Sequence, residues 1–262
     1  MRRPAPFRPA LCLAAALLVA TPLHAQTTSW RWSGTVAAAR AVHIHNVNGA
    51  VEVEPGTGTT VEVVAEKKWR RGNPEDVRIE AHQAGSGGDL TICALWGPAA
   101  RCEPDGIVSR RNRIRNSDVS VKLTIKVPVG ARVDAHTVNG GVTVTGLGGD
   151  VTISTVNGSI TVRNTTGAVS GSTVNGSITA RTTPSATTDV EFSTVNGSIT
   201  LELPSTANTD VNLSVVNGKI FSALPVLLDG ELSRRKVKAR IGAGGPDLRA
   251  RTVNGSIPIR TF

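Results

Sequence analysis

Histidines are the first residues of this chain whose spacing could support chemistry. His43 and His45 flank Ile44, so in an extended strand both side chains point to the same side of the backbone. Two histidines at this spacing can share a metal ion, but a stable site needs a third ligand, and none is obvious. His82 and His136 belong to other segments. We therefore expect a solvated histidine face and no bound metal or other cofactor.

Two cysteines form the next candidate pair. Cys93 and Cys102 have eight residues between them, and the third cysteine, Cys12, lies near the N-terminus. In an oxidising compartment such a pair usually forms a disulfide. Closing so short a loop would contribute roughly 2–3 kcal/mol by chain entropy. A metal site is the weaker alternative, because no histidine or second cysteine pair lies nearby at ligand spacing.

Four aspartates recur at the start of predicted strands, just after variable polar connections: Asp150, Asp189, Asp210 and Asp247. If stacked, they could form an acidic row that binds calcium. Aspartate also hydrogen-bonds its own backbone in turns, which is its commoner use at such positions. The pattern favours turn capping over an ion-binding row.

Catalytic motifs are scarce. The sequence contains no GxSxG, no HExxH and no glycine-rich nucleotide loop. Polysaccharide lyases and hydrolases built on β-helices need an acid–base pair in a groove and aromatic platforms for sugar rings. This chain has no tyrosine, and its four tryptophans all precede residue 100. We expect a protein without enzymatic activity, and a polysaccharide-active enzyme is the alternative.

The tripeptide Val-Asn-Gly marks the elements that must position these residues. The seven copies place their Asn-Gly pairs at Asn48 and Gly49, Asn139 and Gly140, Asn157 and Gly158, Asn175 and Gly176, Asn196 and Gly197, Asn217 and Gly218, and Asn254 and Gly255. From Val138 onward the copies are 18, 18, 21, 21 and 37 residues apart. A period near 20 is typical of repeat architectures. The last gap spans about two periods, so one unit there has lost the tripeptide.

Aliphatic residues alternate with polar ones on both sides of every copy. Around Asn157, for example, Val151 and Ile153 precede the tripeptide, and Ile160 and Val162 follow it. This period of two, rich in β-branched residues, predicts strands with one buried face. Each unit is therefore a strand, an Asn-Gly corner, a second strand and a polar connection of variable length.

Two topologies fit this unit. Asn-Gly between alternating strands is a strong hairpin signal, and a hairpin would pair Thr155 with Ile160. In the alternative, a β-solenoid, successive coils stack in parallel and place identical side chains over one another as ladders. The near-identity of the copies favours an all-β fold, a single β-solenoid of coils of about 18–21 residues with Val-Asn-Gly corners. The corner asparagines and glycines are then structural, because both tolerate left-handed backbone conformations.

The first 25 residues have the pattern of a secretory signal peptide. Arginines at positions 2, 3 and 8 precede the apolar run Leu11–Ala20, and Ala25 offers a small residue for cleavage. Removal of residues 1–25 lowers the formal net charge from +9 to +6. No later segment is long and apolar enough to cross a membrane. We expect residues 26–262 to form one exported domain, periplasmic or at the cell surface, that binds no nucleic acid.

Residues 66–118 interrupt the repeat. This stretch contains KKWRR, the Cys93–Cys102 loop with Trp96, and the basic run RRNRIR. We expect an irregular insertion, and long loops in a regular fold often carry function. The preferred partner-binding residues are Trp96, Arg110, Arg111, Arg113 and Arg115. Arginines suit an envelope component such as an anionic glycolipid, polysaccharide or protein, and a mobile charged loop is the alternative. A second basic run, Arg234–Arg240, is expected to be a degenerate coil with a solvated edge.

Taken together, the export signal, the SWRWSG start (Ser29–Gly34), the HIHNVNGAVEVEPG unit (His43–Gly56) and the serial TVNGSI coils resemble the DUF4097 or toastrack β-repeat family of bacterial envelope proteins. The resemblance covers nearly all of residues 26–262. It implies a β-helical, non-enzymatic, adhesin-like module outside the cytoplasm, linked with envelope stress systems or surface attachment. The family offers no set of catalytic residues to carry over.

Overall fold

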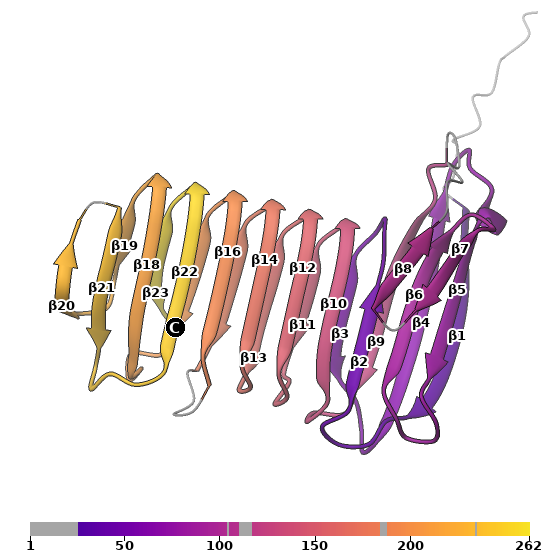
Figure 1. Cartoon of the computed structure of the whole chain (residues 1–262), viewed down its shortest axis with the longest axis horizontal. Helices are drawn as coiled ribbons and strands as arrows, with labels where there is room; N and C mark the ends of the chain where they lie inside the picture. Colours follow the sequence, from indigo (N-terminus) through magenta and orange to yellow (C-terminus); the bar gives the residue numbers. More distant parts are fainter. Residues whose placement is uncertain (1–25, 104, 110–116, 184–187, 234) are drawn as a thin grey trace, which may run out of the picture.

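The computed structural model describes residues 26–103, 105–109, 117–183, 188–233 and 235–262. Two large sheets face each other along the length of the molecule (Figure 1). Apart from the short 3-10 helix η1 (Pro74–Asp76), the regular elements of the described residues are β-strands. No helix within these ranges is long and apolar enough to cross a membrane.

Sheet I has ten strands, in the spatial order β1 (Gln26–Thr35), β4 (Thr60–Trp69), β9 (Ser120–Val127), β3 (Val51–Pro55), β11 (Val142–Thr145), β13 (Ile160–Thr165), β15 (Ile178–Thr182), β17 (Ile199–Leu203), β23 (Ile257–Thr261) and β19 (Ile220–Ser222). Sheet II has eleven, in the order β20 (Val226–Leu232), β21 (Lys236–Ile241), β18 (Thr209–Asn217), β22 (Asp247–Asn254), β16 (Val190–Asn196), β14 (Val169–Asn175), β12 (Val151–Asn157), β10 (Arg132–Asn139), β2 (Ala41–His45), β6 (Leu90–Trp96) and β5 (Val77–Gln83). A separate hairpin consists of β7 (Ala100–Glu103) and β8 (Gly106–Ser109).

Each Val-Asn-Gly corner connects a strand of sheet II to the next strand in sheet I. The strands on either side of the Asn157 corner, β12 and β13, therefore lie in different sheets and do not pair as a hairpin. β12 pairs in parallel with β10 and β14, and Asn157 lies opposite Asn139 and Asn175. The predicted β-solenoid is confirmed. Identical corners stack because parallel pairing places each residue beside its counterpart one coil away.

The core lies between the sheets and is built from the inward residues of every coil. In β12, Val151, Ile153 and Thr155 are buried, whereas Thr152 and Val156 are exposed. The hydroxyl of Thr155 donates to the carbonyl oxygen of Gly140 in the neighbouring coil, at 3.0 Å. Burial of each large aliphatic side chain stabilises the fold by about 1.5–3 kcal/mol, and the hydroxyl is satisfied within the stack.

The order of coils in space differs from their order in the sequence. The last coil, β22 and β23, lies between the β16–β17 coil and the β18–β19 coil and pairs in parallel with both. Figure 1 shows β22, in yellow, between β18 and β16, in orange. The segment between the two displaced coils, residues 223–246, forms no coil of its own.

Antiparallel strands close both ends of the stack. At one end β21 pairs with β18, and β20 pairs with β21. At the other end β5 pairs with β6, β4 pairs with β9, and β1 pairs with β4. The expectation that Arg234–Arg240 is a degenerate coil is therefore wrong, because its described residues belong mainly to the antiparallel cap strand β21. These antiparallel strands cover the outer edges of β18, β6 and β9, whose unpaired backbone groups could otherwise pair with another chain.

The expectation of an irregular insertion at residues 66–118 also needs correction. Strand β6 of this stretch pairs in parallel with β2, and together with β9 it forms a coil next to β2 and β3. Its corner is replaced by residues 97–119, which include the hairpin β7–β8. The sequence pattern hides this coil because β6 is buried on both faces and shows no alternation.

Candidate functional site

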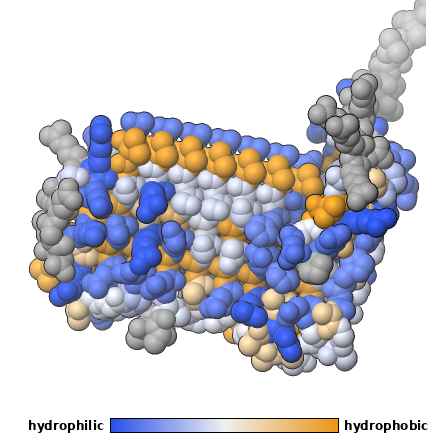
Figure 2. All heavy atoms as spheres, in the orientation of Figure 1, coloured by the Kyte–Doolittle hydropathy of each residue, from blue (hydrophilic) through white to orange (hydrophobic). Residues whose placement is uncertain are grey.

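The outer face of sheet II carries a row of exposed valines. They are the valines of six corners: Val138, Val156, Val174, Val195, Val216 and Val253. Their exposed fractions range from 37% to 49%, and parallel stacking spaces them at about 4.8 Å. Figure 2 shows this row as a continuous hydrophobic line beside a hydrophilic one. The line of valines gives the face one apolar edge.

The hydrophilic line is a ladder of side-chain hydrogen bonds between asparagines. The Nδ2 atom of Asn157 donates to Oδ1 of Asn139 at 2.9 Å, and Asn175 donates to Asn157 at 2.9 Å. The same bond continues through Asn196, Asn254 and Asn217. Each interior asparagine both donates and accepts, so the ladder fixes the register of neighbouring corners.

The corner glycines stack for a reason that differs from the sequence prediction. Of the seven, only Gly49 and Gly218 have a φ in the left-handed range. A Cβ on Gly158 would lie 1.9 Å from the carbonyl oxygen of Gly140, and the same crowding occurs at Gly176. Five of the corner glycines are therefore required by the close approach of the next coil's backbone, not by a positive φ.

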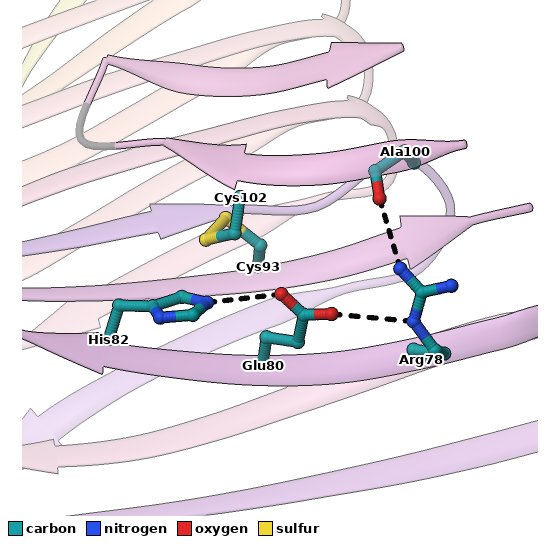
Figure 3. Close-up of a disulfide and its surroundings, with 6 residues drawn as sticks. All are labelled: Arg78, Glu80, His82, Cys93, Ala100 and Cys102. Atoms are coloured by element: carbon teal, nitrogen blue, oxygen red, sulfur yellow. Dashed lines mark hydrogen bonds and ion pairs between the residues drawn. A yellow bond between two sulfur atoms is a disulfide. The ribbon is translucent and has the colours of Figure 1, made fainter. Parts of the chain in front are cut away.

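The hairpin β7–β8 lies on the outer face of sheet II and is held there by the Cys93–Cys102 disulfide, whose Cα atoms are 5.7 Å apart (Figure 3). Cys93, Leu95 and Ala100 are buried beneath it in a small cluster separate from the main core. A guanidinium nitrogen of Arg78 donates to the carbonyl oxygen of Ala100 at 3.0 Å. The predicted disulfide thus attaches an additional layer to the solenoid.

Arg78, Glu80 and His82 form a row of polar side chains along β5 beside this hairpin (Figure 3). Glu80 accepts from Nε of Arg78 at 3.3 Å and lies 3.0 Å from Nε2 of His82. The side chains of this row are largely exposed to solvent. Exposed pairs of this kind contribute little to the free energy of folding, so the main effect of these contacts is to hold the three side chains in fixed positions.

All four histidines of the described residues lie on one face of sheet II, where His45 is buried. His43 lies opposite Thr91 and Asp134, and Thr91 lies opposite His82. His45 lies opposite His136, and their rings stack with centroids 5.4 Å apart and an interplanar angle of 4°. The sequence predicted the shared face of His43 and His45, but the pairing with His136 depends on a register between residues 91 positions apart.

Asp134 joins this group. Its Oδ1 lies 2.7 Å from Nε2 of His136, and its Oδ2 lies 3.4 Å from Nδ1 of His43. Partial burial opposes ionisation of Asp134, but the hydrogen bonds and charges of His136 and His43 outweigh it and hold the pKa of Asp134 below its usual value. The hydrogen bond to Asp134 raises the pKa of His136 against the opposing effect of burial. The pair therefore favours the charged state of both groups.

Two shallow grooves meet at His43. One, of about 280 Å³, includes His82, Asp89 and Glu103 in its lining, and the other, of about 350 Å³, includes Asp89 and Asp134. We call the hairpin β7–β8 together with these grooves the hairpin site. Within the parts of the chain that the structure describes, no group of three or more His, Cys, Asp or Glu side chains is arranged to hold a metal ion. The site offers mixed charge on an open surface.

Of the predicted partner-binding residues, Trp96 is the one that lies within the described residues. Trp96 is half-buried and packs against the main core at the end of β6, so it does not present its ring from the hairpin. Arg110, Arg111, Arg113 and Arg115 lie outside the described residues, as does the predicted signal peptide, residues 1–25. Their roles remain predictions.

The four recurring aspartates act on local structure. An Oδ1 of Asp150 accepts from the backbone N–H of Ala168 at 3.3 Å, and an Oδ1 of Asp189 accepts from the N–H of Asp247 at 3.2 Å. Asp210 pairs with Arg240, and Asp247 pairs with Arg249. None of these four contacts caps a turn of the aspartate's own backbone. Asp150 and Asp189 accept from the backbone of a neighbouring coil, and Asp210 and Asp247 pair with arginines, so the expected turn capping is not what the structure shows.

The sequence and the fold were compared with those of known proteins. A family model described as Toastrack DUF4097 matches residues 84–260. The fold is similar to that of a proposed cell adhesion protein from Clostridium sporogenes, with a TM-score of 0.51, 11% identity, and coverage of 90% of this chain and 100% of the other. The fold is also similar to that of a proposed adhesin from Bacteroides fragilis, with a TM-score of 0.41, 11% identity, and coverage of 90% of this chain and 97% of the other. No curated protein matches the sequence.

Proposed function

The chain belongs to the Toastrack DUF4097 family, and from that premise we propose that it is a non-catalytic, exported binding module of the bacterial cell envelope, adhesin-like in its use of an exposed surface. Its contact surface is the hairpin site and the basic run of residues 110–115 that follows the hairpin in the sequence. The similar fold of a proposed cell adhesion protein supports this role. The association with envelope stress rests on the family resemblance alone.

One observation carries the proposal. Among the stacked coils, the β6–β9 coil is the one whose corner is replaced by a long segment, residues 97–119. The start of this segment is fixed by the disulfide on the outer face, over its own small apolar cluster. A segment whose start is fixed on a rigid sheet loses less conformational freedom there on binding, which favours affinity.

The binding test uses the purified mature chain and isolated envelope fractions. In one variant, Arg110, Arg111, Arg113 and Arg115 are all replaced by serine. The matched control replaces four cations of the opposite sheet surface, Arg31, Lys68, Arg163 and Arg260, in the same way. We expect envelope binding to fall at least about tenfold in the first variant only. Unchanged envelope binding in the four-arginine variant would show that this basic run is not part of the contact surface.

Export and the absence of catalysis are tested separately. N-terminal sequencing of the protein from the envelope fraction should begin at Gln26. Incubation with acidic polysaccharides should yield no product. Turnover that a single substitution such as Asp134→Asn abolishes would replace this proposal by the polysaccharide-active alternative.

A further inference from the structure

A second charged surface lies at the C-terminal end of sheet II, far along the same outer face from the hairpin site. Figure 2 shows hydrophilic side chains gathered over β18 and β22 there. Ser214 lies opposite Lys236 on one side and Arg251 on the other. Asn212, two residues earlier, lies opposite Lys238 and Arg249 in the same way. We call these six residues the basic trough.

The trough has charged walls and a neutral floor. Lys236 and Lys238 on β21 and Arg249 and Arg251 on β22 are exposed, whereas Asn212 and Ser214 between them are half-buried. Part of it is a groove of about 480 Å³, whose lining includes Asn212, Lys238 and Arg249 and, at its acidic end, Asp210 and Asp247. The floor residues carry an amide and a hydroxyl, which can donate hydrogen bonds to an anion.

The walls hold more positive charge than the neighbouring acids neutralise. Arg249 is paired with Asp247 and lies opposite Glu191 of β16, and Arg240 lies 3.5 Å from Asp210. Within the described ranges, Lys236, Lys238 and Arg251 make no ion pair. Three like charges on the two strands that flank β18, on one face of the sheet, create a positive potential, which is relieved by a bound anion.

The dimensions of the trough suit a tetrahedral oxyanion. Its walls are two strand spacings apart, about 9.6 Å, and its two rows are separated by about 6.8 Å along the strands. Charge-assisted hydrogen bonds of about 2.8 Å from both walls can then reach one phosphate group held above the floor. The planar fork of arginine also matches two oxygens of one phosphate.

The central coils provide an internal comparison. At the row of Ser214, strands β16, β14 and β12 carry Ser193, Ser172 and Ser154. Ser193 still lies beside Arg251, whereas Ser172 has a serine on each side and therefore offers the same floor without cationic walls. Beyond the trough, Arg235 and Lys219 contribute to the lining of a larger groove of about 790 Å³. Positive charge is therefore concentrated where the antiparallel cap meets the last coils.

We propose that the basic trough is a binding site for phosphate groups, either of a soluble phosphate ester or of a lipid headgroup. The inference goes beyond the proposed function, because it uses no residue of the hairpin site and assigns a ligand class to a separate surface.

The test titrates the mature chain with inorganic phosphate and follows the backbone amides of β18 and β22 by NMR. One variant combines Lys236→Gln, Lys238→Gln and Arg251→Gln. The matched control, Arg31→Gln, Arg163→Gln and Arg260→Gln, removes the same charge from the outer face of sheet I. We expect binding at least about tenfold weaker in the trough variant and unchanged in the control. Equal melting temperatures exclude misfolding.

A second arm separates the two phosphate sources. Vesicles of phosphatidylglycerol are compared with vesicles of phosphatidylcholine that contain no anionic lipid. Trough-dependent binding to the anionic vesicles, displaced by free phosphate, identifies a lipid headgroup. Phosphate binding without vesicle binding identifies a soluble ester.

Two results would overturn the proposal: phosphate that fails to bind the wild-type chain, or phosphate binding that weakens equally in both variants. The four-arginine variant used to test the proposed function should still bind phosphate. Failure of the proposed function and failure of this inference therefore give different results.

Discussion

The glycine of each repeated corner lies against the backbone of the next coil. A side chain at Gly158 would meet the carbonyl oxygen of Gly140, and the crowding comes from backbone atoms that no rotamer change can move away. Glycine is therefore needed where two coils touch, and at five of the seven corners the local conformation alone would accept other residues. This distinguishes the corners from ordinary tight turns.

The change Gly158→Ala should reduce the free energy of unfolding by about 1–3 kcal/mol, the usual cost of overpacking. Gly130→Ala is the matched control, because a Cβ at Gly130 meets no atom within 4 Å and its φ is not left-handed. Chemical denaturation of both variants measures the difference. Equal stability would contradict the close approach of coils at the corner.

The asparagine ladder predicts a graded effect. Asn157→Ala removes two ladder bonds, whereas Asn217→Ala removes one, because Asn217 is the last member of the ladder. We expect a loss of about 1 kcal/mol for Asn157→Ala and about half of that for Asn217→Ala. Thermal or chemical unfolding measures both. A larger loss at Asn217 would mean that the bonds do not carry the effect.

The Asp134–His136 pair predicts a pH dependence. His136 has a raised pKa, so its contribution is complete below its usual value near pH 6.5 and is lost as the pH rises through the folded-state value. Asp134 has a lowered pKa, so its contribution is complete above about pH 3.9 and is lost as the pH falls through its folded-state value. The pair should stabilise the fold most between about pH 4 and 6.5.

A double-mutant cycle with Asp134→Asn and His136→Gln measures this pair directly. The coupling energy should be present at about pH 5.5 and should decrease by about pH 9. A coupling energy that does not change over this range would show that the pair is held by packing rather than by charge.

At the scale of elements, the hairpin β7–β8 is an attachment to the sheet surface. Its apolar cluster is separate from the main core, and its covalent link to sheet II is the disulfide. A layer of this kind can open without the unfolding of the sheet beneath it.

The double change Cys93→Ala and Cys102→Ala should therefore act locally. Hydrogen exchange of the amides of β7 and β8 should accelerate at least about tenfold, while the amides of β12 and β14 keep their wild-type rates. Mass spectrometry of peptic fragments measures both regions. Uniform acceleration across the solenoid would show that the disulfide supports the whole fold.

At the scale of the whole molecule, the last coil joins two parts of the stack. β22 bonds to β16 and β18, and β23 bonds to β17 and β19. Leu248, Ile257 and Ile259 of this coil are buried in the main core. Removal of residues 246–262 should therefore lower the melting temperature by at least about 10 °C.

A peptide of residues 246–262, added to the truncated chain, should restore much of the lost stability. The same peptide with Gly255→Val should not, because a Cβ at Gly255 would lie 2.0 Å from the carbonyl oxygen of Gly197. Equal restoration by both peptides would contradict specific insertion between the two coils.

The sequence predicts the coils better than their order. Each copy of the repeat contains its own strands and corner, so the solenoid follows from local alternation and the identity of the copies. The order of the coils in space does not follow from the sequence, because nearly identical corners can stack on one another in any order. For the same reason, the meeting of His43 with Asp134 and the basic trough on β18, β21 and β22 depend on contacts between distant segments. The reason for the corner glycines was also missed, since crowding by a neighbouring coil is not visible in one copy.

The position of the last coil has a consequence for biosynthesis. A ribosome makes the chain from its amino end, so the coil of β18 and β19 is complete before the coil that separates it from β16 and β17 exists. Folding cannot simply follow translation to the end of the chain. A chain that ends before Asp247 lacks the coil that joins β18 and β19 to β16 and β17. Such a product has a gap inside its stack, between these two coils, and quality-control proteases would act on it there.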